Sequence, residues 1–247
     1  MYTEAFKKEI EEFNSERLKG KTLDEILTVI RGLKKKIGHL KNIVEHPEFE
    51  EPYHEFGPKG ELFMLLLYLD ETKRVFTELG GKYKLSAAEK KAETFDRNIP
   101  HIVRIEARNG NSKYGYKYYF FDLSDDTVTM EYSSDSGPRQ PHRPWGPTNR
   151  EEFLEDLRDI HMGTWRRSYT LERFNYTKYN EIAWYDEDEW WVTFYYDNQT
   201  KPVSFEGNRA YPHNYLLLSD LLNLLSIDVP EDVRLAQIEK DSEKENW

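Results

Sequence analysis

The sequence contains no cysteine among its 247 residues. This absence excludes disulfide bonds, thiol nucleophiles and cysteine-ligated metal sites, and it fits a reducing compartment. Long apolar runs are absent too, because the longest, residues 62–69, is far short of the ~20 residues that span a bilayer. The first residues are charged and amphipathic, so we expect no signal peptide and place the protein in the cytoplasm.

Glycine-rich phosphate-binding motifs are also missing. Neither the P-loop pattern nor Gly-x-Gly-x-x-Gly occurs, which argues against nucleotide-dependent catalysis by the folds that use them. The seven histidines are scattered, and no pair has His-x-x-x-His spacing. His46 and His54 stand among glutamates and are able to hold a metal, but a solvated acidic loop is the favoured interpretation. We therefore predict no metal, no cofactor and no catalytic residue.

Charge is distributed unevenly along the chain, whose net charge is -11. Residues 1–100 hold 18 basic and 19 acidic residues, whereas residues 101–247 hold 17 and 27. An acidic surface repels the phosphate backbone of nucleic acids, so direct nucleic-acid binding is disfavoured. The same surface favours a protein partner that presents basic residues.

The first part of the chain has the periodicity of amphipathic helices. Helices are expected in the first segment, which Gly20 ends, and in residues 22–44, 59–79 and 86–99. Two capping boxes, Thr22 with Glu25 and Ser86 with Glu89, indicate where two of these helices begin. Residues 1–99 are therefore predicted to form a helical hairpin or bundle.

From residue 101 onward the apolar pattern changes to the period of two that is typical of strands. Strands are expected in residues 101–108, 114–122, 128–132, 182–185, 190–196 and 202–206, and helices in 148–160 and 214–225. Asn109-Gly110 predicts the first hairpin turn, and Thr148 a helix cap. Four prolines predict an irregular loop in residues 133–147. The predicted fold class is α+β, with two helices packed on an antiparallel sheet in residues 100–228, followed by a polar tail in 229–247.

An acidic turn precedes the most aromatic strand. It consists of Asp186, Glu187, Asp188 and Glu189, with Trp190 next to it. Its oxygens are able to bind Ca²⁺ or Mg²⁺, but the spaced ligands and the glycine of a calcium loop are missing. The other interpretations are a charged hairpin tip that keeps the strands apart from other chains, and a partner-binding epitope.

Arg166 and Arg167 follow Trp165 and form the second candidate site. Arginine stacks on aromatic rings and clamps carboxylates or phosphates, so these residues are candidates for partner binding. The alternative is that they are the internal partners of nearby acids. Trp145, in the proline-rich loop, is either an exposed anchor for a partner or a residue that folds back on the strands.

Three motifs resemble those of an uncharacterised family of bacterial accessory proteins that are often associated with mobile elements. They are Phe95-Asp96-x-x-Ile99-Pro100, Leu157-Arg158-x-x-His161-x-Gly163-x-Trp165-Arg166-Arg167-x-Tyr169 and Gly207-Asn208-x-x-Tyr211-Pro212-x-Asn214-Tyr215. The resemblance implies no known activity. The acidic turn departs from the short Asp-Gly turn usual in the family.

These features favour a non-enzymatic protein whose acidic, aromatic second half binds a basic protein surface. An accessory protein of this kind fits an inhibitor of a host defence nuclease, such as an anti-CRISPR protein. The alternative is an enzyme without a recognisable motif, a hydrolase or nuclease that uses His161, Arg166 and carboxylates. A third interpretation, a single-stranded nucleic-acid binder with aromatic stacking platforms, is opposed by the net charge.

Overall fold

A computed structural model describes residues 4–47, 49, 57–134, 137–170 and 188–222. The chain has an α+β fold and divides into two compact units, residues 1–90 and residues 91–247. None of the helices in the described ranges has the length and hydrophobicity that crossing a bilayer requires. The predicted strand at 182–185 and the tail at 229–247 lie outside these ranges.

The first unit is helical. It contains α1 (Glu4–Phe13), a π-helix (Asn14–Leu18), α2 (Leu23–Val44), α3 (Pro58–Glu78) and the start of α4 (Ala87–Asn98). Apolar residues three and four apart place one face of α2 against α3. The core of this unit consists of Ile26, Ile30, Leu33, Ile37, Leu40, Val44, Leu62, Leu65, Leu69 and Phe76.

Both predicted capping boxes are confirmed. The Thr22 amide donates to the Glu25 carboxylate at 2.8 Å, and the Glu25 amide donates back to the Thr22 hydroxyl at 3.4 Å. Ser86 and Glu89 form the same reciprocal pair, at 2.9 and 3.3 Å. These bonds satisfy amides that have no partner inside the helix, and so fix the first residues of α2 and α4.

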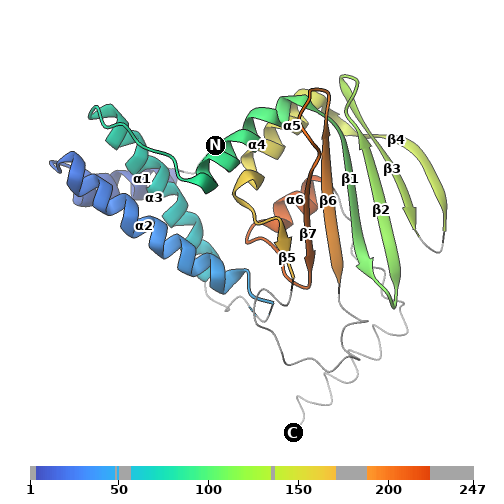
Figure 1. The fold of residues 1–247 in the computed structure, drawn as a ribbon, viewed down its shortest axis with the longest axis horizontal. Coiled ribbons are helices and arrows are strands. Elements are labelled where there is room, and N and C mark those ends of the chain that lie inside the picture. The colour runs from blue at the N-terminus through green and yellow to red at the C-terminus, as the bar shows by residue number, and fades with distance from the viewer. Residues whose placement is uncertain (1–3, 48, 50–56, 135–136, 171–187, 223–247) are drawn as a thin grey trace, which may run out of the picture. The chain divides into compact units, whose positions relative to one another are not determined.

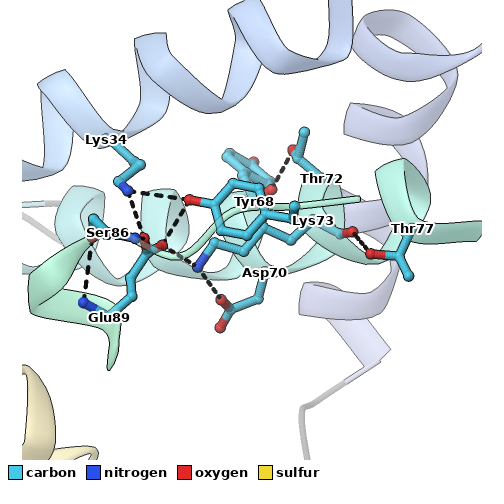
Figure 2. A network of polar contacts seen from close by, with 9 residues as sticks. Lys34, Tyr68, Asp70, Thr72, Lys73, Thr77, Ser86 and Glu89 are labelled. Carbon is cyan, nitrogen blue, oxygen red and sulfur yellow. Dashed lines mark hydrogen bonds and ion pairs between the residues drawn. The ribbon is translucent and has the colours of Figure 1, made fainter. Parts of the chain in front are cut away.

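Glu89 has a second role, as the centre of a polar network in the helical unit (Figure 2). Its carboxylate accepts from Lys34 on α2 at 2.9 Å and from the Tyr83 hydroxyl at 2.8 Å. Lys73 on α3 lies 3.1 Å from the same carboxylate. One side chain at the start of α4 therefore connects three helices.

The second unit contains one seven-stranded sheet, in the order β4-β3-β2-β1-β6-β7-β5 (Figure 1). Its elements are β1 (Ile102–Asn111), β2 (Gly115–Asp122), β3 (Thr127–Ser134), β4 (Gly137–Asn149), β5 (Ser168–Tyr169), β6 (Glu189–Tyr196), β7 (Val203–Asn208), α5 (Arg150–Asp159), α6 (Tyr215–Leu221) and 3-10 turns at Ile99–His101 and Met162–Thr164. All strand pairs are antiparallel except β5 with β7, which is parallel.

The core of this unit lies between one face of the sheet and three helices, one more than predicted. The additional helix is α4, whose Phe95 ring packs edge-on against Phe194 at 5.4 Å and Phe205 at 5.7 Å. Helices α5 and α6 contribute Phe153, Leu154, Leu157 and Leu218 to the same cluster. Strand residues that point toward the helices complete it, among them Ile105, Ala107, Tyr119, Phe121, Val192 and Phe194.

The prediction of an irregular loop at residues 133–147 is wrong. Strand β3 continues to Ser134, and residues 137–149 form β4, the edge strand beside β3, although the pairing shifts register at three points. Proline has no amide hydrogen to donate and is therefore excluded from central strands. An edge strand leaves half of its amides outside the ladder, so it tolerates proline. The edge position and the register shifts explain how this segment pairs despite its prolines.

The first hairpin turn also differs from the prediction. Asn109-Gly110 belongs to β1, which continues to Asn111 before a turn at residues 112–114. The Asn111 side chain accepts from the amides of Lys113 and Tyr114 at 3.1 and 2.8 Å. Gly115 ends the turn with a φ of 87°, which glycine adopts without steric cost.

The start of α5 differs from the prediction by one residue. Asn149, not Thr148, is the cap, because its side-chain oxygen accepts from the Glu152 amide at 2.9 Å.

Candidate functional site

The acidic turn is only partly within the described structure: Asp186 and Glu187 lie outside it. Asp188 accepts from the Asn111 side chain at 2.9 Å, and its carbonyl accepts from the Arg209 amide at 2.8 Å. It therefore joins the end of β1 to the segment after β7. This internal role accounts for Asp188 without a partner protein or a cation.

Trp190 lies in the core. Its side chain is 2 % exposed, and its indole N–H donates to the Ala210 carbonyl at 2.9 Å. The ring stacks on Tyr211 and contacts Trp165 and Tyr215. This differs from the predicted place of Trp190 on a partner-binding surface.

Asn214 connects two of the motif segments that carry the family resemblance. Its side-chain oxygen accepts from the Trp165 indole N–H at 2.8 Å, and its amide donates to the Ile160 carbonyl at 2.6 Å. Asn214 stands at the start of α6, but its side chain makes no capping bond to that helix.

Two glycines of these motifs, Gly163 and Gly207, stand where a larger residue would clash with its neighbours. A Cβ atom on Gly163 would lie 2.6 Å from the Ala92 carbonyl oxygen on α4, and a Cβ atom on Gly207 would overlap the Trp190 ring. Close packing accounts for both glycines.

Arg166 and Arg167 lie just before β5. The Arg166 amide donates to the Tyr169 hydroxyl at 3.1 Å. The Arg167 guanidinium lies 4.6 Å from the centre of the Phe205 ring and donates to the Ser204 carbonyl at 3.4 Å. Arg167 forms no ion pair within the described residues. The described structure therefore shows no internal acidic partner for this arginine, which was one of its two interpretations.

Trp145 has its backbone in β4, and its side chain is outside the described part of the structure. Its two interpretations, as an anchor or as a residue folded back on the strands, therefore remain predictions.

The sequence analysis did not single out one further candidate surface, the face of the sheet that points away from the core. Alternation along the strands defines this outer face. It consists of Arg104, Glu106 and Arg108 on β1; Tyr116, Tyr118, Phe120 and Asp122 on β2; Thr129, Glu131 and Ser133 on β3; Glu189, Trp191, Thr193 and Tyr195 on β6; and Ser204 and Glu206 on β7. The core cluster that joins the sheet to α4, α5 and α6 contains none of these residues.

One end of the outer face is organised around Glu106. The Arg104 guanidinium lies 4.0 Å from the centre of the Tyr195 ring and 3.3 Å from the Glu106 carboxylate. The Tyr195 hydroxyl donates to the same carboxylate at 2.8 Å. Burial and this hydrogen bond raise the pKa of Tyr195, so the hydroxyl keeps its proton.

The other end repeats the arrangement around Glu189. The Arg108 guanidinium lies 4.3 Å from the centre of the Tyr116 ring and donates to Glu189 at 2.8 Å. The Tyr116 hydroxyl donates to the same carboxylate at 3.2 Å. Glu189, predicted as part of the acidic epitope, is therefore on the outer face but is paired with an arginine of its own chain.

The outer face is aromatic and acidic. Its five rings, each half-buried, are Tyr116, Tyr118, Phe120, Trp191 and Tyr195. Among the side chains that the structure describes, its carboxylates are Glu106, Asp122, Glu131, Glu189 and Glu206, against the two guanidiniums of Arg104 and Arg108. Rings of this kind offer a large contact area at low entropic cost, and the excess of carboxylates attracts a basic surface.

Two residues carry the enzyme alternative, His161 and Arg166, and the described part of the chain includes both. His161 is exposed, has a left-handed φ of 55° and lies two residues after the last residue of α5. Neither His161 nor Arg166 lines the pocket of about 480 Å³ beside α5, which is formed by Arg150, Arg158 and neighbouring residues. Within the described ranges, no group of three His, Asp or Glu side chains is placed to hold a metal ion.

Comparison with known proteins adds no relative to this description: no family model, no curated protein and no solved structure matches the chain.

Proposed function

We propose that the protein is a non-enzymatic binding protein that uses the outer face of its sheet to bind a basic surface on a protein partner. The observation that carries this proposal is the outer face itself, whose described side chains include five aromatic rings, five carboxylates and two arginines. In the described part of the unit, no helix contributes to a cluster that covers it.

The contacts within the outer face hold several of its side chains in place before a partner binds. Arg104 and Arg108 hold the Tyr195 and Tyr116 rings by stacking, and the two hydroxyls are hydrogen-bonded to glutamates. Side chains that are ordered before binding lose less entropy when a partner arrives. The face is therefore prepared for a partner before contact.

The charge of the face favours a protein over a nucleic acid. Aromatic strands that stack on bases usually stand beside free cations that contact the phosphates. Here the two guanidiniums in the described part of the face are paired with glutamates, and carboxylates outnumber them, which disfavours a phosphate backbone. The charges of the face therefore favour a protein partner over a nucleic acid.

The partner class that fits this chemistry is a nucleic-acid-handling enzyme, because such enzymes carry basic surfaces for their substrates. An acidic face on such a surface would exclude the substrate electrostatically and sterically. We therefore propose inhibition of a host defence nuclease, in the manner of an anti-CRISPR protein, as the biological role.

Affinity capture with matched variants tests the binding face. Trp191→Ala removes a ring of the outer face, and Glu206→Lys reverses one of its exposed charges. Glu155→Lys makes the same reversal on α5, away from this face. A partner retained by the wild type and by Glu155→Lys, but lost from both outer-face variants, is expected. A partner retained equally by all four proteins would contradict the proposal.

One observation favours the enzyme alternative. Asp96 on α4 has a buried carboxylate oxygen without a hydrogen-bond partner in the described structure. Burial raises the pKa of Asp96, although the charges of His161 and Arg158 oppose the shift. A carboxyl group beside a histidine is suited to acid–base chemistry. If the protein is a hydrolase or nuclease, His161→Ala should abolish that activity and leave partner capture unchanged.

A further inference from the structure

Guanidinium groups on the outer face are held between an aromatic ring and a carboxylate. Arg104 lies 4.0 Å from the centre of the Tyr195 ring and 3.3 Å from the Glu106 carboxylate. Arg108 is held in the same way at the other end of the face. A ring offers its electron-rich surface and a carboxylate its charge, so the two together bind the planar, delocalised cation of arginine.

Another ring and carboxylate of the outer face, those of Trp191 and Glu206, stand side by side. Trp191 on β6 is the Cα partner of Glu206 on β7, and the two strands are antiparallel neighbours in the sheet (Figure 1). Side chains of opposed residues point to the same face, with their Cβ atoms about 5 Å apart. A cation placed against the ring is therefore within reach of the carboxylate.

This ring and carboxylate hold no cation in the described part of the chain. Glu206 forms no ion pair there, and no basic side chain lies over the Trp191 ring. Arg108 stands opposite Trp191 on β1, but its guanidinium stacks on Tyr116. The charge of Arg108 is paired with Glu189 at 2.8 Å, so it opposes the approach of a second cation only weakly.

The pair is open to an approaching side chain. Glu206 is exposed and Trp191 is half-buried, so both are reached from the solvent. The next opposed residues of the outer face on these strands, Thr193 and Ser204, are small, and their hydroxyls hydrogen-bond to each other at 2.8 Å. These short side chains leave space beside the ring for a planar group from a partner.

We propose that Trp191 and Glu206 form a subsite for an arginine side chain of the protein partner. The guanidinium stacks on the indole ring and donates to the carboxylate, as the arginines of the face do with their own rings and glutamates. Lysine fits less well, because its ammonium is a strongly hydrated point charge that neither stacks nor forms a fork. The inference rests on the proposed function, since it names the group through which the outer face recognises a basic surface.

Titration of the full chain with N-acetyl-arginine amide tests the subsite without a partner, through the NMR signal of the Trp191 indole N–H. Trp191→Phe assigns this signal by its loss. At constant ionic strength we expect it to shift with half-saturation on the order of 100 mM, because one exposed ring and one carboxylate bind a cation weakly. Glu206→Gln should lower the initial slope of the titration by about threefold, because the ion pair is lost.

Glu155→Gln, at an exposed carboxylate on α5, is the matched control and should bind the arginine probe as the wild type does. N-acetyl-citrulline amide, a neutral analogue of the same shape, and N-acetyl-lysine amide should both give smaller slopes. An equal slope with either analogue, or a wild-type slope in Glu206→Gln, would overturn the subsite.

The same titration separates the subsite from the proposed function. If the arginine probe leaves the Trp191 signal unchanged while both outer-face variants still lose the captured partner, the subsite falls and the binding face stands. If the probe binds as expected but every variant retains the partner, the proposed function falls, and the assignment of a partner's arginine to the subsite falls with it.

Discussion

Glu89 shows how much one side chain contributes to the helical unit. It closes the capping box of α4 and accepts from Lys34 and Tyr83, with Lys73 also in contact (Figure 2). Its side chain is 18 % exposed. Burial disfavours the charged form, but the hydrogen bonds from Lys34, Ser86 and Tyr83 outweigh it and hold the pKa of Glu89 well below its usual value.

This lowered pKa makes the stability of the helical unit depend on pH. The unfolded chain takes up a proton near the usual pKa of 4.5, whereas the folded chain does so only at lower pH. The contribution of Glu89 is therefore fully present above about pH 5 and is lost as the pH falls through the folded pKa. Urea unfolding at a series of pH values should show the stability decreasing across this window.

Glu89→Gln should remove this pH dependence and destabilise the unit at pH 7 by about 2 kcal/mol, because charge-assisted hydrogen bonds are lost. Glu16→Gln, an exposed residue of the π-helix, serves as the control and should change stability little. An unchanged pH profile in Glu89→Gln would show that the carboxylate does not stabilise the fold.

The neighbouring residues Trp190 and Trp191 show what the sequence could not decide. Both are large and apolar, so composition cannot tell which ring faces the core. The pairing of β6 with β1 and β7 decides it, by placing Trp190 over Ala210 and Trp191 opposite Arg108. The sequence located the aromatic strand correctly, but the choice between a core and a binding residue depended on contacts with distant strands.

At the scale of elements, local signals predicted starts of helices better than ends of strands. The Thr22 and Ser86 caps are confirmed because each bond lies within one turn of the chain. The proline-rich segment and the Asn109-Gly110 turn were misjudged because edge position and register depend on the neighbouring strand. For the same reason, the outer face could not be recognised before the order of the strands was known.

The packing of α4 against the 3-10 turn at Met162–Thr164 leads to an element-scale prediction. Gly163→Ala should destabilise the protein by about 1–3 kcal/mol, because the new Cβ would meet the Ala92 backbone and force α4 to move. Gly38→Ala, on α2, has open space around its Cβ and should be neutral or stabilising by up to about 1 kcal/mol. Thermal unfolding of both variants checks this contrast, and equal stability of the two would contradict the packing.

On the scale of the whole molecule, the acidic excess lies in the half of the chain that contains the outer face. Residues 101–247 carry 27 acidic and 17 basic residues, and the outer face adds its rings to that excess. Electrostatic complementarity mainly increases the rate of association and the selectivity, whereas the aromatic contacts slow dissociation. The two contributions respond differently to salt.

Binding of a captured partner should therefore weaken as salt rises. Between about 50 mM and 500 mM salt the screening length falls to a few ångströms, so we expect at least a tenfold loss of affinity, mostly in the association rate. Surface plasmon resonance at several salt concentrations measures both rates. An affinity independent of salt would exclude a basic partner surface.

The most direct measurement is hydroxyl-radical footprinting of the protein with and without its captured partner, because it reports the exposure of individual aromatic side chains. Trp191, Tyr118 and Phe120 should be oxidised in the free protein and protected in the complex. Trp190, one residue away but 2 % exposed, should resist oxidation in both states. Outer-face rings that stay equally reactive in the complex would contradict recognition through this face.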